Sequence, residues 1–152
     1  MKTHRYATRV QWTAANEDGT TSYGAYSRNH AIGAAGKPAI LASSDPAFRG
    51  DGSRYNPEEL LVASLSSCHM LWYLHLCSVN GITVVDYRDD ASGAMEENGG
   101  GGQFVEVELR PVVKILQASQ RVAALALHNA AHRSCFIARS VNFPVKVAAR
   151  IA

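Results

Sequence analysis

A chain of 152 residues is long enough to bury a core without cross-links, and we expect a single domain over residues 1–152. Lys and Arg total 15 against 13 acidic residues, and a net charge of +2 without a basic cluster argues against nucleic acid as the partner. The N-terminal segment lacks an apolar signal region, and serine and histidine break the longest apolar segment, residues 60–76. We therefore expect a cytoplasmic protein that spans no membrane.

The first third of the chain predicts two strands followed by a long loop. Residues 3–28 alternate apolar and polar side chains around Asp18-Gly19, a pattern typical of a β-hairpin. Residues 29–55 are rich in Gly, Ala, Ser and Pro, and predict a loop with one short strand near residues 39–42. Loops of this length in compact domains are usually functional.

Residues 56–79 predict a central helix. The N-x-x-E pattern from Asn56 to Glu59 indicates a capping box, with Pro57 at the first helical position, and Gly81 would end the helix. Apolar side chains occupy nearly its whole circumference. We expect the rest of the fold to cover this helix on most sides.

The remaining chain predicts a second hairpin, a second helix and a closing strand. Residues 81–97 and 102–116 meet at Asn98 and a run of four glycines, the last of which is Gly102, and the second segment alternates apolar with charged residues. Residues 119–132 have helical spacing, and residues 143–152 predict a single strand. The order β-β-loop-α-β-β-α-β indicates an α+β fold.

Three cysteines without an export signal indicate buried thiols, redox chemistry or a metal site rather than structural disulfides. Cys68 and Cys77 lie nine residues apart on one helix, so they point about 180° apart, about 13 Å along the axis. Cys77 is interpreted as a core or subunit-contact thiol. Cys135, just after the second helix, is the partner within the chain that Cys68 could meet.

A reactive Cys68 would need a nearby cation, because a cysteine in mid-helix lacks the electrostatic help of a helix N-terminus. Arginine suits this task because it is always charged and presents a fork of donors. Arg28 and Arg49 lie at or within the long loop before the helix. Each is a candidate, and each has the alternative interpretation of a solvated loop residue.

Two segments carry a resemblance to a known family. The segment "NPEELLVASLSSCHM", with Cys68 ten positions after Glu58, resembles the N-P-E-[EQ]-L…C segment of the osmotically inducible protein C and organic hydroperoxide resistance family. The segment "AHRSCFIARSVNFPV" resembles the second cysteine segment of that family, and the expected element order agrees over nearly the whole chain. The resemblance implies an OsmC-like fold, with two β-sheets wrapped around central helices, in an intertwined homodimer whose active site lies at the subunit interface.

The resemblance also implies an enzyme, a thiol-dependent peroxidase that reduces organic hydroperoxides in oxidative-stress defence, with hydrogen peroxide as a further candidate substrate. Cys68 matches the peroxidatic cysteine, Cys135 the resolving cysteine, and Glu58 the carboxylate that pairs with the catalytic arginine. Branches of the family supply this arginine from different places in the loop, and we favour Arg49 over Arg28. No cofactor or metal is implied beyond an external thiol or lipoyl-type dithiol reductant.

Helix geometry bears on the implied dimer. On one straight helix Glu58 and Cys68 are separated by about 15 Å of rise. A Glu58 that acts at Cys68 through an arginine must therefore come from the partner subunit, unless the arginine spans the gap. The alternative interpretation of Glu58 is an acid in the first turn that interacts favourably with the helix dipole.

Two other classes of function compete with the peroxidase. His128, His132 and Cys135 have i, i+4, i+7 spacing and could bind a metal ion, with His69 or Cys68 as a fourth ligand. A non-catalytic dimeric binding module on the same fold predicts no thiol turnover.

Substrate preference stays open at the sequence level. An apolar wall would suit an organic hydroperoxide, although such residues are more often core: Leu60, Leu61, Leu65, Leu71 and Trp72. His69 and Phe136, which follow the two cysteines, depart from the best-characterised branches of the family.

Overall fold

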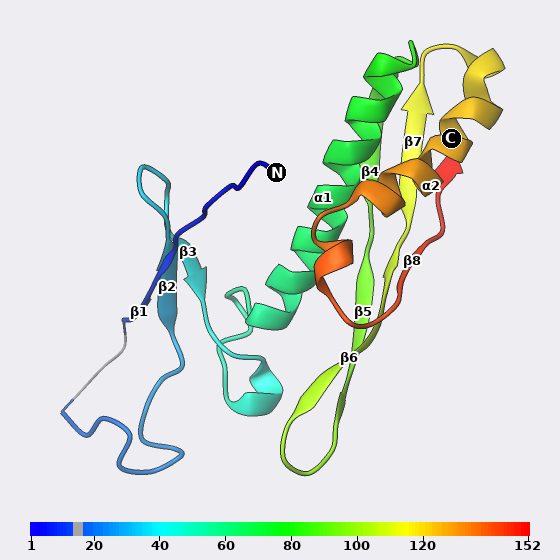
Figure 1. Ribbon diagram of the computed structural model, residues 1–152. Helices are drawn as coiled ribbons and strands as arrows, with labels where there is room; N and C mark the ends of the chain where they lie inside the picture. The colour runs from blue at the N-terminus through cyan, green and yellow to red at the C-terminus, as the bar shows by residue number, and fades with distance from the viewer. Residues whose placement is uncertain (14–16) are drawn as a thin grey trace. The chain divides into compact units, whose positions relative to one another are not determined.

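The computed structural model describes residues 1–13 and 17–152 (Figure 1). The chain forms two compact units, residues 1–60 and 61–152. Within the described residues the strands form three three-stranded sheets, accompanied by two α-helices. The predicted α+β class is confirmed.

The first unit contains one antiparallel sheet in the order β1-β2-β3, with β1 at Arg9–Trp12, β2 at His30–Gly33 and β3 at Ile40–Ala42. The short strand predicted near residues 39–42 is confirmed as β3. The sequence predicted that the second strand of the first hairpin would directly follow Asp18-Gly19, and this prediction is wrong. The strand that pairs with β1 begins at His30, within the segment that we expected to be loop. Asp18 instead accepts a hydrogen bond from the Thr21 amide in a local turn (3.2 Å), and residues 14–16 of that hairpin lie outside the described part.

The long helix α1 spans Pro57–Val79, as predicted. The capping box is present, since the Glu59 amide donates to Asn56 Oδ1 (2.8 Å) and the Asn56 amide donates to Glu59 Oε2 (3.2 Å). At the other end Gly81 adopts a positive φ of 69°, and the Ile82 amide donates to the Cys77 carbonyl (2.9 Å). Local sequence therefore sets both ends of this helix.

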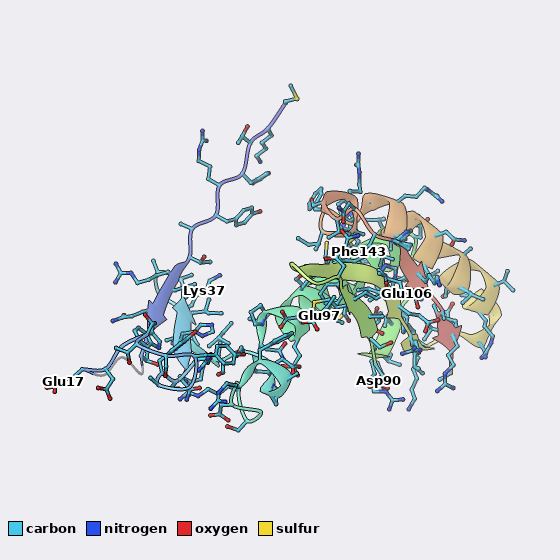
Figure 2. All side chains as sticks on the ribbon, turned by 90° about the horizontal axis from the view of Figure 1, so that it is seen from below. Glu17, Lys37, Asp90, Glu97, Glu106 and Phe143 are labelled. Atoms are coloured by element: carbon cyan, nitrogen blue, oxygen red, sulfur yellow. The ribbon has the colours of Figure 1, made fainter. Side chains whose placement is uncertain are left out.

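The second unit contains two sheets, in the orders β4-β7-β9 and β5-β6-β8. The strands span Val84–Asp89 (β4), Ser92–Glu97 (β5), Gly102–Leu109 (β6), Pro111–Ile115 (β7), Val145–Val147 (β8) and Arg150–Ile151 (β9). The glycine-turned hairpin is confirmed as β5 and β6, closed by a hydrogen bond from the Asn98 amide to the Gly101 carbonyl (3.0 Å). Glu97, at the end of β5, and Glu106, on β6, are labelled in Figure 2.

The chain end forms two short strands rather than the single predicted one. The ribbon of paired strands divides between two sheets near Asp90, where the Arg110 amide donates to Asp89 Oδ1 (2.6 Å; Asp90 is labelled in Figure 2). The closing segment follows this division, so β8 pairs in parallel with β6 and β9 in parallel with β7. The prediction treated residues 143–152 as one strand because their composition does not show the break.

The second helix, α2, spans Arg121–Ser134 after a short 3₁₀ helix, η2, at Ala118–Gln120, close to the predicted residues 119–132. Two apolar clusters hold the unit together. One joins α1 and α2 to the β4-β7-β9 sheet, and its buried members include Tyr73, Val113 and Ala124. The other joins Leu65 of α1 to β6 and β8, and includes a pair of rings, Phe104 and Phe143, with centroids 5.5 Å apart (Phe143 is labelled in Figure 2).

The expectation that α1 is covered on most sides is not met by the contacts within its own unit, residues 61–152. Only 22% of its 18-residue apolar window, with a mean hydropathy of 1.4, is buried, and Leu71 and Val79 are more than half exposed. By length and composition α1 could cross a membrane, a property it shares with the core helices of many soluble proteins. The buried side chains of α1 form one stripe: Leu65, His69, Tyr73 and Cys77.

Candidate active site

Two cysteine thiols meet between α1 and α2. Cys68 lies in the middle of α1 and is half-buried, whereas Cys135 is the C-cap residue of α2 and is buried. The Cys68 side chain lies close enough to Cys135 to affect the Cys135 thiol, and both thiols are free. The partner that the sequence offered to Cys68 is therefore in contact with it.

The environment of Cys135 favours the protonated thiol. Burial, and secondarily the neighbouring Cys68 thiol, raise the pKa of Cys135 to about 11. The Ala138 amide lies 3.4 Å from Cys135 Sγ and acts in the opposite direction, as does the amide of Ile137. At neutral pH Cys135 is a fixed, uncharged thiol beside Cys68.

Cys77 lies in the apolar cluster of α1, α2 and the β4-β7-β9 sheet, and is 1% exposed. Burial raises the pKa of its thiol. The interpretation of Cys77 as a core thiol is confirmed.

An aromatic pair lies close in sequence to the two cysteines. Trp72, one helical turn after Cys68, contacts Phe136 edge to face with centroids 5.4 Å apart, and Phe136 directly follows Cys135. Phe136 is 67% exposed, whereas Leu65 is fully buried in the core. Of the apolar wall suggested by the sequence, Leu65 is core, and Trp72 is the member whose position beside Cys68 supports a contact with substrate.

Buried histidines lie beside the cysteines. His69 Nε2 and His128 Nδ1 are 3.0 Å apart, and both residues are almost completely buried. The His128 ring also stacks on Tyr73, with centroids 3.8 Å apart and planes 11° apart. Burial lowers the pKa of His69 to about 4 and that of His128 to about 3, so both rings are neutral at physiological pH.

The geometry gives no support to the metal alternative. Among residues 1–13 and 17–152, no group of three or more His, Cys, Asp or Glu side chains could hold a metal ion. His128, which the helical spacing offered as a ligand, instead faces His69, and His132 Nδ1 is buried without a hydrogen-bond partner. The i, i+4, i+7 spacing thus places these residues along the contact between α1 and α2.

Both candidate arginines lie around one tyrosine of the first unit. The Arg28 guanidinium donates to the carbonyls of Tyr26 and Tyr23 (both 2.5 Å) and lies over both rings, 3.9 Å from the Tyr26 centroid and 4.7 Å from the Tyr23 centroid. Arg49 lies over the Tyr23 ring at 5.7 Å. The alternatives left open by the sequence are therefore neighbours.

The two arginines differ in the number of partners that their guanidinium groups bind. Arg28 uses both terminal nitrogens on backbone carbonyls. Arg49 makes no ion pair within the described residues, and its backbone has a φ of 62°, rare for a residue with a side chain. Arg49 follows the 3₁₀ helix η1 at Pro46–Phe48, and its own amide donates to the Pro46 carbonyl (3.0 Å).

Glu58 lies in the first turn of α1. In the part of the chain that the structure describes, its carboxylate forms no ion pair with Arg28 or Arg49. Its predicted pairing with the catalytic arginine stays a prediction.

Sequence reasoning missed the stack of His69, His128 and Tyr73. The signal on α1 was available, because Leu65, His69, Tyr73 and Cys77 recur every four residues and so share one helix face. The partner on α2 could not be read from spacing, since it depends on how the two helices pack.

Comparisons with known proteins agree with the fold. Residues 50–150 match the family model described as OsmC-like protein. An OsmC-like protein of unknown function from Vibrio cholerae is 32% identical, with a TM-score of 0.85 over 99% of this chain and 100% of the other. No curated protein matches the sequence.

Two more distant structures share the fold. An organic hydroperoxide resistance protein OsmC from Legionella pneumophila is 20% identical, with a TM-score of 0.68 over 99% of both chains. An organic hydroperoxide resistance protein from Elizabethkingia anophelis is 19% identical, with a TM-score of 0.67 over 100% of this chain and 99% of the other. Together with the match over residues 50–150, these likenesses show that the chain belongs to the OsmC-like family.

Proposed function

We propose that this protein is a thiol-dependent peroxidase that reduces organic hydroperoxides through Cys68 and Cys135. The observation that carries the proposal is the proximity of these two thiols, one in the middle of α1 and the other at the end of α2. Two structures of the same fold are named organic hydroperoxide resistance proteins, which supports an organic hydroperoxide as the substrate class.

The chemistry needs two steps at sulfur. The Cys68 thiolate attacks the distal peroxide oxygen, the O–O bond breaks, and the alkoxide leaves as an alcohol after taking a proton. The resulting sulfenic acid condenses with the Cys135 thiol, which forms the disulfide and releases water. An external thiol or lipoyl-type dithiol then reduces the disulfide by exchange.

The half-buried position of Cys68 and the buried position of Cys135 fit these separate roles. A peroxidatic sulfur must be reached by substrate, whereas a resolving thiol needs only to reach the first sulfur. The exposed Phe136 ring and Trp72 provide an apolar surface beside the pair, which supports a substrate with an organic group.

Arg49 is the better candidate for the catalytic arginine. Its guanidinium has no carboxylate partner within the described residues, and the positive φ of its backbone is the kind of local strain found at functional sites. Arg28 is engaged by two carbonyls and two rings, and acts as a clamp that organises the segment around Tyr23 and Tyr26.

A second copy of the chain is the proposed cover for the exposed apolar face of α1. Only 22% of the apolar window is buried within one chain, and Leu71 is 61% exposed at the middle of the helix. A dimer that buries this face would be stabilised, because additional apolar surface would be removed from water. It would also allow Glu58 or Arg49 of one subunit to act at Cys68 of the other.

The central experiment compares cysteine variants in a coupled assay with cumene hydroperoxide, tert-butyl hydroperoxide and hydrogen peroxide. Cys68→Ser should abolish peroxide consumption. Cys135→Ser should allow oxidation of Cys68 and block recycling by a lipoyl-type dithiol. Cys77→Ala is the matched control on the same helix and should stay active. Equal activity in the wild type and Cys68→Ser would end the proposal.

A mixing experiment tests the shared site. Cys68→Ser and Arg49→Ala are each expected to be inactive, but if one site uses both chains, each mixed dimer holds one intact site. After subunit exchange, verified with mass-tagged chains, the mixture should regain about a quarter of the wild-type activity. Absence of recovery in verified mixed dimers would place Cys68 and Arg49 in the same subunit.

A further inference from the structure

The contact between α1 and α2 contains two side-chain hydrogen bonds. His69 and His128 meet at 3.0 Å, and the Tyr73 hydroxyl donates to the Ala124 carbonyl (3.1 Å). Ala124 and Ala131 are fully buried on the α2 side, so small residues allow the helices to approach. The polar contacts fix how far one helix can slide along the other, because apolar contacts alone are not directional.

The histidine pair is a defined geometric element. The two rings are nearly parallel, with centroids 5.3 Å apart and planes 11° apart, and the Tyr73 ring extends the stack beyond His128. Both histidines are neutral because they are buried, so one ring donates and the other accepts. The groups that face the pair are His132 of α2 and Asp89 of β4, and Asp89 is itself held by Ser66 (2.6 Å) and by the Arg110 amide.

The positions of the histidines link them to the cysteines. His69 directly follows Cys68 on α1, and His128 lies seven residues, about two helical turns, before Cys135. A slide of α2 by one residue would move Cys135 by about 1.5 Å. Because the sulfur atoms of a disulfide must approach to about 2 Å with a specific dihedral angle, such a slide would disfavour closure.

We propose that the His69–His128 pair is a positioning element that holds Cys135 in line with Cys68 for the disulfide-forming step. This inference rests on the proposed peroxidase cycle. In that step the new S–S bond forms, the S–O bond of the Cys68 sulfenic acid breaks, and the hydroxyl leaves as water with the proton of Cys135. No further oxidant or reductant takes part.

The resolving thiol has a particular need for positioning. Burial keeps Cys135 protonated, so it gains little from thiolate character before the reaction. Its rate therefore depends on being held next to the electrophilic sulfur, since correct orientation can supply several orders of magnitude and a misplacement of about 1 Å can cost about 100-fold.

Three variants separate the hydrogen bond from the packing. His128→Phe keeps a ring that can stack on Tyr73 but removes the hydrogen bond. His69→Leu removes the same bond from the α1 side. His69→Gln is the conservative variant, because its amide can still donate to His128 Nδ1. His75→Gln, at an exposed histidine of α1, is the control for changes to that helix.

The test resolves the two steps in single turnovers with cumene hydroperoxide. Sulfenic acid is trapped with a carbon nucleophile, and the Cys68–Cys135 disulfide is followed by mass spectrometry. Sulfenic acid formation should stay within about twofold of the wild type in all variants, whereas disulfide formation should slow about 10-fold or more in His128→Phe and His69→Leu. His69→Gln and His75→Gln should stay close to the wild-type rate. A wild-type rate of disulfide formation in either His128→Phe or His69→Leu, or an equal loss in His69→Gln and His69→Leu, would overturn the proposal.

A second measurement keeps this test independent of the peroxidase assignment. Diamide oxidises the two thiols to a disulfide without a peroxide, so closure can be timed even if Cys68 forms no sulfenic acid. Slower diamide closure in His128→Phe and His69→Leu, with retention in His69→Gln, supports positioning. Absence of sulfenic acid in the wild-type protein would instead contradict the proposed function.

Discussion

The two units of the chain hold opposite kinds of chemistry. Between α1 and α2 of residues 61–152, desolvation lowers the pKa of His69 and His128 and raises that of Cys135, so these three buried groups are uncharged at neutral pH. In residues 1–60 two permanently charged guanidinium groups surround one tyrosine ring. The second unit thus keeps the three buried groups between its helices uncharged, whereas the first unit gathers two guanidinium charges around one ring.

This division has a mechanistic consequence. A peroxidatic cysteine reacts as the thiolate, and a cation is the usual means of stabilising it. Within the described residues of the second unit, no Lys or Arg forms an ion pair or hydrogen bond with Cys68 or Cys135. If the chain is a peroxidase, the cation must come from elsewhere, and Arg49 has the guanidinium that is least committed to its own surroundings.

The largest expected effect separates Arg49 from Arg28. Arg49→Ala should reduce peroxide turnover by about 100-fold or more, since loss of one preorganised charged donor typically costs that much, while thermal stability stays close to the wild type. Arg28→Ala should reduce stability by about 1 to 2 kcal/mol, because it deletes the hydrogen bonds to Tyr23 and Tyr26. Turnover assays and thermal melts of both variants check this, and the reverse pattern would assign the catalytic role to Arg28.

A substitution beside Arg49 tests whether the geometry of that turn matters. A Cβ atom at Gly50 would lie 1.5 Å from the Ser44 carbonyl oxygen and 2.9 Å from that of Asp45, so Gly50→Ala must rebuild the turn. We expect a loss of about 3 kcal/mol in the free energy of unfolding, together with reduced turnover. Gly33→Ala is the control, because no atom lies within 4 Å of its Cβ position. Urea denaturation with activity assays compares the two; wild-type turnover in Gly50→Ala would show that the site tolerates a displaced Arg49.

The features of the fold and of the candidate site that depend on local sequence could be predicted, whereas those that depend on contacts between distant residues could not. The bounds of α1 were predictable because the Asn56–Glu59 capping box and Gly81 are local signals. The cysteines were identified through two family-like segments, and helix periodicity correctly separated Cys77 from Cys68.

What could not be predicted arises from contacts between distant segments. Composition shows that α1 is apolar all round, but it does not tell whether the same chain or another covers each face. The partner of His69 depends on how α2 packs, so spacing alone offered His128 as a metal ligand. The residues after Asp18-Gly19 show alternation, yet residues 17–26 form turns and bends, and β1 pairs with His30–Gly33. Contacts between distant residues accompany this pairing, such as the hydrogen bond from Trp12 Nε1 to the Ser27 carbonyl (2.8 Å).

The burial of His69 and His128 predicts a dependence of stability on pH. The folded-state pKa values of His69 and His128, about 4 and about 3, lie below the ordinary value of 6.5. As the pH falls below 6.5 the unfolded chain binds protons that the folded chain excludes, so stability decreases, by up to about 1.4 kcal/mol per pH unit for each histidine. His132 and Asp89 face the pair and act in opposite directions on His69.

Urea denaturation between pH 6.5 and 4 measures this slope. The double variant His69→Gln with His128→Asn removes both ionisable rings, and its unfolding free energy should fall less steeply with acid than that of the wild type. Identical slopes would show that the two histidines do not resist protonation, and that the contact between α1 and α2 tolerates charge.

The smallest expected effect concerns the second polar contact between the helices. Tyr73→Phe deletes the hydrogen bond to the buried Ala124 carbonyl and should cost about 1 kcal/mol of stability. Tyr87→Phe is a matched control, because the Tyr87 hydroxyl is buried without a hydrogen-bond partner and the ring lies 6.0 Å from that of Tyr73. Removal of the Tyr87 hydroxyl should leave the free energy of unfolding unchanged or raise it, since burying an unpaired hydroxyl is costly. Equal losses in the two variants would mean that the packing of the rings, rather than hydrogen bonding, holds this contact.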